Sequence, residues 1–219
     1  MNEKTREDAP ICIDLYAGTG GWTRGFLAEG YRCFGFDIER HTYTKDCPEC
    51  DGTGNFYRHD EDGDFLDCGE CDEGRVTVTY PGQLILQDAR TLHGSQFRNA
   101  SVIVASPPCQ EFTRHQLPWT KRRNPPPPDL SLIEAAFRIA IEAGRPLVLE
   151  NVREAQRYIG PAKAHYGSRY LWGDVPPILP FAEKSRKERM SSSAVAQRSE
   201  IPFDLAQFIA RVFRPEAAR

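Results

Sequence analysis

Two short apolar runs in this chain are each followed closely by a polar residue that can do chemistry. Residues 102–105 lead into a Pro-Pro-Cys-Gln segment at 107–110, and residues 146–149 lead into a Glu-Asn-Val segment at 150–152. Runs of this length favour buried strands over helices. Because sites in an open α/β sheet collect beyond the carboxyl ends of the strands, the two runs predict a sheet edge that brings a thiol and a carboxyl group together.

Size and composition limit the chain to one good-sized core and at most one small additional module. It has 219 residues, of which 40% are hydrophobic and 27% charged, as in a soluble globular protein. No apolar run approaches the roughly 20 residues of a membrane span. The charged first eight residues are unlike a signal peptide. We therefore expect a cytoplasmic, monomeric protein without contact to membranes.

The alternation of segments predicts the fold class. The first part of the chain has the order strand 10–15, glycine turn 17–21, helix 22–29 and strand 31–36. This order is typical of an α/β fold with a Rossmann-like, doubly wound sheet. The pattern continues with expected strands at 76–80, 83–88, 102–105, 147–149 and 166–172, and with helices at 132–143 and after Pro202. We expect Asp129 or Ser131 to cap the first of these helices and Gly144 to end it. The last helix should present one apolar face, made of Leu205, Phe208, Ile209, Val212 and Phe213.

Three aspartates fall at the ends of successive expected strands. Asp37, after the second strand, is in the position where dinucleotide-binding folds hold ribose hydroxyls, and Asp88, after the third, is placed to receive an adenine amino group. The glycine turn lets a ligand approach the backbone closely. Each aspartate alone is more often a cap or a solvated charge. Asp14, Asp37 and Asp88 together predict an adenosine-containing cofactor.

Cys109 and Glu150 are the candidate chemical groups. An isolated cysteine is more often a small buried residue than a nucleophile. The flanking prolines favour presentation of the Cys109 thiol, and a helix N-terminus or a nearby arginine would lower its pKa. Glu150 ends an apolar run, where burial raises the pKa of a carboxyl group so that it can deliver a proton. The pair suits a thiolate that adds to a ring and an acid that protonates the same ring.

Four of the seven cysteines form two pairs, Cys47 with Cys50 and Cys68 with Cys71, separated by 17 residues. This spacing is typical of a structural zinc site, in which four thiolates fill the tetrahedron. We therefore expect residues 46–75 to form an inserted zinc module with four cysteine ligands. Residues 46–73 carry eleven carboxylates and one arginine, which argues against strong contact with phosphates. A rigid staple, a DNA contact and a protein contact all remain open for this module.

The chain resembles a known family in three motifs. Asp-Leu-Tyr-Ala-Gly-Thr-Gly-Gly at 14–21, Pro-Pro-Cys-Gln at 107–110 and Glu-Asn-Val at 150–152 are similar, in this order, to motifs of the cytosine-C5 DNA methyltransferases, and in particular of the short phage or prophage type. The resemblance implies that Cys109 adds to C6 of a flipped-out cytosine, that Glu150 acts on N3 and that Arg169 holds O2. It also places Asn151 among the catalytic residues.

The resemblance further implies a methyl donor and a nucleic acid partner. S-adenosylmethionine is the implied cofactor, bound by a methyltransferase domain of residues 10–45 and 76–219, and the implied substrate is DNA, duplex or single-stranded. The implied cofactor-binding residues are Asp14, Tyr16, Ala17, Gly18, Gly20, Asp37, Ile38, Asp88 and Pro107. The loop after Cys109 would close over the base, with DNA contacts expected from Gln110, Arg114, Lys121, Arg122 and Arg123.

The C-terminal third departs from the family. About 30 residues separate Trp172 from Pro202, so the large target recognition region of the family is missing and we expect short or relaxed sequence specificity. In the segment that best matches the family's glycine–asparagine–serine–valine stretch, Arg198 replaces the asparagine. A cation there raises the hypothesis of a donor with an extra carboxylate, carboxy-S-adenosylmethionine.

Two alternatives to DNA methylation stay open. The missing recognition region leaves room for a C5-pyrimidine methyltransferase that acts on RNA or on a free nucleotide. A different class of protein is a non-catalytic, zinc-containing adaptor that binds nucleic acid on a methyltransferase scaffold. The intact Cys109, Glu150 and glycine turn argue against the adaptor.

Overall fold

The computed structural model describes residues 8–57, 65–113, 126–178 and 200–215. Its central sheet contains, in chain order, β1 (Ile11–Leu15), β2 (Arg32–Asp37), β7 (Gln83–Leu86), β8 (Val102–Ala105), β9 (Leu147–Asn151), β10 (Ala164–Tyr166) and β11 (Arg169–Gly173). The helices are α2 (Gly21–Ala28), α3 (Gln110–Thr113), α5 (Ser131–Ala143), α6 (Gln156–Ile159) and α8 (Phe203–Val212), with short 3-10 turns η1 (Ala89–Thr91), η2 (Gly94–Phe97) and η4 (Arg153–Ala155).

The sheet is mostly parallel and has the strand order β10-β11-β9-β8-β1-β2-β7. β7, β2, β1, β8 and β9 pair in parallel, whereas β11 runs antiparallel to both β9 and β10. This is a Rossmann-like, doubly wound sheet, as the sequence predicted. Because the central strands are parallel, their carboxyl ends meet at one edge of the sheet.

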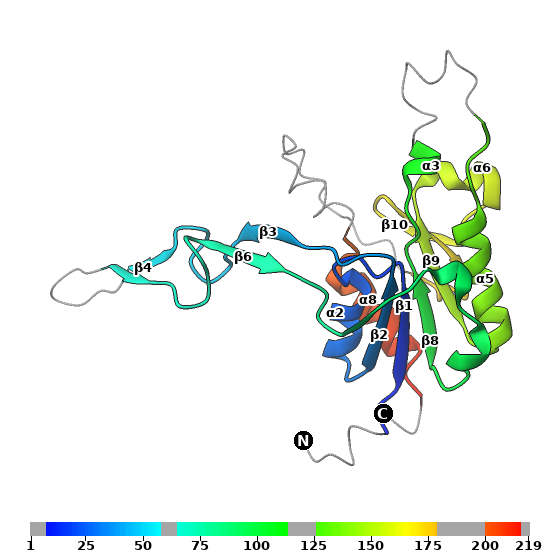
Figure 1. Cartoon of the computed structure of the whole chain (residues 1–219), viewed down its shortest axis with the longest axis horizontal. Coiled ribbons are helices and arrows are strands. Elements are labelled where there is room, and N and C mark those ends of the chain that lie inside the picture. Colours follow the sequence, from blue (N-terminus) through cyan, green and yellow to red (C-terminus); the bar gives the residue numbers. More distant parts are fainter. Residues whose placement is uncertain (1–7, 58–64, 114–125, 179–199, 216–219) are drawn as a thin grey trace.

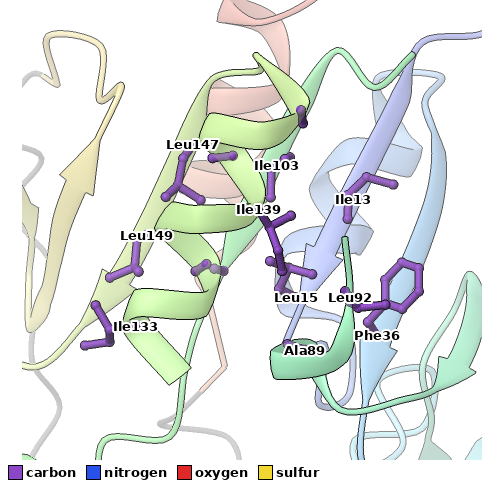
Figure 2. Packing of buried hydrophobic residues seen from close by; sticks show 14 of the residues in the cluster. Ile13, Leu15, Phe36, Ala89, Leu92, Ile103, Ile133, Ile139, Leu147 and Leu149 are labelled. Carbon is purple, nitrogen blue, oxygen red and sulfur yellow. The ribbon is translucent and has the colours of Figure 1, made fainter. Parts of the chain in front are cut away.

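Helices cover both faces of the sheet (Figure 1). On one face, α5 packs Ile133 and Ile139 against Ile103, Leu147 and Leu149, as Figure 2 shows. On the other face, α2 and α8 enclose a second cluster built on Phe26, Leu205 and Ile209. Coverage on both sides explains why β8 and β9 are apolar at successive positions rather than alternating.

Several boundaries differ from those expected. β9 continues to Asn151, so Glu150 and Asn151 lie within the paired part of the strand rather than beyond it. The single strand expected at 166–172 is a hairpin of β10 and β11, because Gly167 adopts a positive φ of 56° and turns the chain. In α8 the expected apolar face is narrower, since Val212 is 40% exposed.

The start of α5 also differs from the expectation. We expected Asp129 or Ser131 to cap this helix, but the cap position is Leu130, which makes no side-chain cap bond. Asp129 instead accepts a 2.8 Å hydrogen bond at Oδ1 from the amide of Ser131, one residue before the cap. The predicted stop at Gly144 is confirmed by its left-handed conformation.

The segment between β2 and β7 projects from the body of the protein as an arm (Figure 1). In it, β3 (Tyr43–Asp46) pairs with β6 (Arg75–Val78), and β4 (Asn55–Tyr57) pairs with β5 (Phe65–Asp67). We call the described residues 43–57 and 65–78 the cysteine arm, because they carry the four paired cysteines. The β3–β6 ladder begins and ends three residues outside the predicted module boundaries of 46 and 75. None of the helices in the described part of the chain has the length and hydropathy of a membrane span.

Candidate active site

A cavity of about 580 Å³ opens at the carboxyl edge of the sheet. It gathers most of the predicted site residues, namely Tyr16, Gly18, Asp37, Ile38, Asp88, Pro107, Cys109, Gln110, Glu150, Asn151 and Arg169. Of the described candidates, Asp14, Ala17 and Gly20 do not line it. Arg114, Lys121, Arg122, Arg123 and Arg198 lie outside the described residues. One cavity thus holds both the expected catalytic groups and the expected cofactor groups.

Glu150 is buried beside Arg169. The Glu150 residue is 6% exposed, and Arg169 Nη1 lies 3.7 Å from Glu150 Oε1. The two residues meet because β11 pairs with β9 and places Leu171 opposite Glu150, two residues after Arg169. Burial raises the pKa of Glu150, while the Arg169 charge and the Ser106 hydroxyl oppose the rise. The expected direction of this pKa shift is confirmed.

The Cys109 thiol is half-buried just before α3. Burial raises its pKa, the Glu150 charge raises it further, and Arg169 acts against both. The expectation that a helix end or an arginine sets a low pKa is therefore wrong in net direction. Arg169 is present, but desolvation and the facing carboxylate outweigh it. A proton on Glu150 removes one of these two causes and favours the thiolate.

Asn151 has a structural connection to the cysteine segment. Its side chain is buried, and Nδ2 donates a 2.9 Å hydrogen bond to the carbonyl oxygen of Pro107. The amide of Val152 donates to Asn151 Oδ1 at 2.8 Å. Asn151 therefore fixes the segment that carries Cys109 relative to β9, as well as lining the cavity.

The cavity is also lined by residues that we expected to bind an adenosine-containing cofactor. Asp37 Oδ2 accepts a 2.9 Å hydrogen bond from the Gly18 amide, and Ile38 is 71% exposed at the cavity wall. A Cβ atom added at Gly18 would meet nothing within 4 Å, so there is open space above the turn. Asp88 caps η1 and pairs with Arg90 at 2.6 Å. Tyr16 adopts a positive φ of 60° and donates from its hydroxyl to the Leu132 carbonyl oxygen at 2.5 Å.

Asp14 lies beneath the glycine turn in a buried polar network. It is 1% exposed, and its Oδ2 accepts a 2.7 Å hydrogen bond from Thr23 Oγ1, which also lies 2.7 Å from the Tyr80 hydroxyl. Asp14 Oδ1 has no hydrogen-bond partner among the described residues. Burial raises the pKa of Asp14 to about 7, the Asp37 charge adds to the rise, and the Thr23 hydrogen bonds oppose it.

This pKa predicts a loss of stability as the pH rises. Between the usual aspartate value near 4 and about pH 7, Asp14 keeps its proton only in the folded state, so the free energy of unfolding falls through this window. Asp14→Asn removes this contribution. We expect the stability of the variant relative to the unmodified protein to rise by roughly 2–4 kcal/mol between about pH 4 and pH 7, measured by urea unfolding.

Asp129→Asn serves as the matched control for Asp14→Asn. The Ser131 amide lowers the pKa of Asp129, so this exposed carboxyl group stabilises the protein as the pH rises. The relative stability of Asp129→Asn should therefore change in the opposite direction to that of Asp14→Asn. Parallel curves for Asp14→Asn and the unmodified protein would contradict the assignment of the buried acid.

Two contributors to the site were missed in the sequence. The Ser106 hydroxyl accepts a 2.9 Å hydrogen bond from Trp22 Nε1 and also bonds the Glu150 carboxyl group. Its position directly before Pro107 was an available signal. Tyr43, at the base of the cysteine arm, lines the cavity as well. No local pattern indicates this, because Tyr43 reaches the cavity only through the way the arm leaves the sheet.

The four paired cysteines converge in the cysteine arm. All four Sγ atoms lie within 4.8 Å of one another, with 3.8 Å between Cys47 and Cys68 and 3.7 Å between Cys50 and Cys71. A zinc tetrahedron with Zn–S bonds of about 2.3 Å has edges of about 3.8 Å. The Gly54 amide donates to Cys50 Sγ at 3.3 Å, as thiolate ligands require. These donors fit a structural zinc ion with no open coordination position.

Loss of one ligand should remove the metal. We expect Cys50→Ala to lower the zinc content from about one ion per chain to nearly none, because three thiolates leave the tetrahedron incomplete. Elemental mass spectrometry of the desalted protein measures the content, and limited proteolysis reports opening of the arm. Cys33→Ala, which changes a buried cysteine of the sheet, should keep its zinc. Equal zinc in both variants would contradict the site.

Comparisons with known proteins give structural likeness only. No family model matches the chain, and no curated protein matches it. Among solved structures, one from Escherichia coli is described as a DNA modification methyltransferase encoded within a prophage. It is 17% identical, with a TM-score of 0.38, over 69% of this chain and 34% of that one. DNMT2 from Spodoptera frugiperda is 19% identical, with a TM-score of 0.34, over 68% of this chain and 37% of that one.

The methyltransferase EhMeth from Entamoeba histolytica is 14% identical, with a TM-score of 0.38, over 68% of this chain and 40% of that one. This chain thus spans little more than a third of the length of these solved proteins. At such TM-scores the likeness carries no argument about activity, so a function must rest on the cavity itself.

Proposed function

We propose that this protein is an S-adenosylmethionine-dependent methyltransferase that modifies C5 of a cytosine base in DNA. The observation that carries the proposal is the cavity that Cys109, Glu150 and Arg169 share with Gly18, Asp37 and Ile38. A nucleophile, a proton donor and an anchoring cation line one end, and groups suited to adenosine line the other. A methyltransferase fold without catalytic work would not need a buried acid facing a thiol.

The cavity residues suit attack on a pyrimidine ring. Cys109 Sγ forms a bond to C6, and the electron pair of the C5–C6 double bond shifts into the ring. Glu150 donates its proton to N3, which neutralises the negative charge that develops there. C5 becomes nucleophilic and takes up the methyl group. The methyl group gives up its bond to the sulfur of the donor as it joins C5. A base then takes the C5 proton, the C5–C6 double bond re-forms as the bond from C6 to the Cys109 sulfur breaks, and the N3 proton returns to Glu150. Arg169, whose guanidinium lies beside Glu150, would hold the O2 atom.

The same wall has the groups that would hold the cofactor. S-adenosylmethionine, when bound, supplies a methyl group activated by its positively charged sulfur. Asp37 would accept the ribose hydroxyls, Ile38 would pack on the adenine, and Asp88 would reach the amino group. Tyr16, Gly18 and Pro107 would complete the site, while Asp14, Ala17 and Gly20 would support the glycine turn without lining the cavity.

The domain division and specificity are part of the same proposal. We assign residues 10–45 and 76–219 to the methyltransferase domain and residues 46–75 to a structural zinc module. The short stretch between Trp172 and Pro202 supports relaxed sequence specificity. Because the residue lies outside the described part of the chain, the Arg198 hypothesis of a carboxylated donor stays a prediction.

Covalent trapping tests the proposal and separates its alternatives. The purified protein is incubated with S-adenosylmethionine and with duplex DNA, single-stranded DNA, RNA or a free nucleotide, each containing 5-fluorocytosine. Because fluorine cannot leave C5 as a proton does, the Cys109–C6 bond persists and a mass spectrometer detects the adduct. We expect an adduct with DNA. An adduct with RNA or the free nucleotide alone would favour the first alternative, and none with any substrate would favour the adaptor.

A further inference from the structure

Glu200 joins three parts of the candidate site. Its backbone carbonyl oxygen accepts a 2.9 Å hydrogen bond from Arg169 Nη2. Its carboxylate forms an ion pair with Arg24 of α2 and accepts a 2.7 Å hydrogen bond at Oε2 from the Tyr43 hydroxyl. Arg24 in turn donates to the Thr19 carbonyl oxygen in the glycine turn at 2.8 Å. Arg24 and Tyr43 thus hold the side chain of Glu200, while its backbone carbonyl holds the guanidinium of Arg169. We call Arg169 and Glu150 the catalytic pair of the proposed function.

Tyr43 connects Glu200 to a segment outside the central sheet. It is the first residue of β3 and pairs with Val78, so it lies at the base of the ladder that supports the cysteine arm. The two hydrogen bonds at Glu200 form a connection of three residues from the arm to Arg169. A change in the arm that moves Tyr43 would release one restraint on Glu200 and hence on Arg169.

We propose that Glu200 is a positioning residue for Arg169 and that Tyr43 couples the cysteine arm to the active site through it. The inference deepens the proposed function, because it assigns the arm a role in the geometry of the catalytic pair. It concerns the described residues alone and does not require that the arm contact nucleic acid.

The charge state of Cys109 gives a readout that does not depend on methyl transfer. The charged groups that act on this thiol are Glu150 and Glu154, which raise its pKa, and Arg169, which lowers it. If Glu200 holds Arg169 in place, then releasing Arg169 weakens the only cationic influence among these groups. The pH dependence of Cys109 alkylation should then move upward, because the thiolate is the reactive form.

The experiment measures iodoacetamide labelling of the Cys109 peptide across a pH series by mass spectrometry. We expect Glu200→Ala to raise the labelling midpoint by about half a pH unit and to slow adduct formation with 5-fluorocytosine DNA about tenfold. Tyr43→Phe should move the midpoint less and in the same direction. In the variant that combines both substitutions, Tyr43→Phe should add nothing to the midpoint shift of Glu200→Ala, because the two residues act on Arg169 through the same connection.

Glu29→Gln is the matched control. Glu29 pairs with Arg211 at 2.9 Å, at the opposite end of α2 from the glycine turn. Its substitution should therefore leave the pH midpoint of Cys109 labelling unchanged. If Glu200→Ala does not fold, Glu200→Gln serves in its place, since its amide oxygen still accepts from Tyr43 while the ion pair with Arg24 is lost. That variant should give an upward shift intermediate in size.

Two results would overturn the inference: an unchanged midpoint in the Glu200 variants, or effects of Tyr43→Phe and Glu200→Ala that simply add. Neither outcome depends on whether the protein methylates DNA. If no trapping substrate gives an adduct but the labelling midpoints move as described, the proposed function fails and the positioning role of Glu200 stands.

Discussion

Cys109→Ala is expected to lower methyl transfer by at least about a thousandfold and to abolish the covalent adduct. Cys109 carries the only thiol among the described residues that line the cavity with Glu150 and Arg169. Without it, C6 receives no electron-rich partner, and C5 stays too weak a nucleophile. Transfer of labelled methyl groups to DNA measures the loss, and sequencing of DNA from producing cells shows whether methylated cytosine disappears.

The control for this variant is Cys33→Ala. Cys33 is a buried, free cysteine on β2. It lies opposite Cys12 in the ladder with β1 and does not line the cavity. It should keep both the adduct and methyl transfer, apart from any loss of stability measured in the same preparation. Methyl transfer that survives in Cys109→Ala would remove the covalent mechanism altogether.

Glu150→Gln is expected to slow methyl transfer by about a hundredfold to a thousandfold, because an amide can donate a hydrogen bond to N3 but cannot give up a proton. In the unmodified protein, the raised pKa of Glu150 also means that activity falls as the pH rises and the acid loses its proton. This falling limb should be absent in Glu150→Gln, whose rate should follow ionisation of the thiol alone. Methyl-transfer rates across a pH series measure both effects.

The same substitution should make Cys109 more reactive toward a simple reagent. The negative charge of Glu150 is, after burial, the main cause that raises the pKa of Cys109, so its removal leaves only burial and the weaker influence of Glu154 against the Arg169 charge. The midpoint of iodoacetamide labelling should therefore move to lower pH while methyl transfer collapses. Opposite changes of the two measurements would separate a proton donor from a residue that only maintains the fold. If both activities fell together, Glu150 would be structural.

The fold was largely predictable because its signals are local. Continuous apolar runs at β8 and β9, and the glycine stop after α5, depend only on neighbouring residues. The errors arose where pairing partners decide a boundary. Glu150 and Asn151 join β9 only because β11 pairs with them, and the β10–β11 hairpin depends on the turn at Gly167.

The sequence predicted which residues line the cavity better than it predicted the pKa shifts of those residues. Strand ends indicated Asp37, Cys109 and Glu150, and all three line the cavity. The cysteine spacing indicated a cluster that the arm indeed brings together. The roles of these residues stay predictions. Asp14, in contrast, was expected at the cavity wall and is buried beneath it, because Thr23 and Tyr80 cover it.

By itself, the sequence determined the alternating α/β pattern, the two chemical groups after apolar runs, and the paired thiols of the arm, because each depends on residue type and short-range spacing. Only the tertiary structure decided that Arg169 faces Glu150 and that the pKa of Cys109 rises rather than falls. It also decided that Glu200 accepts hydrogen bonds from both Tyr43 of the arm and Arg169. These features depend on desolvation and on contacts between segments far apart in the chain. Both arise only when the strands pair and the helices pack on the two faces of the sheet.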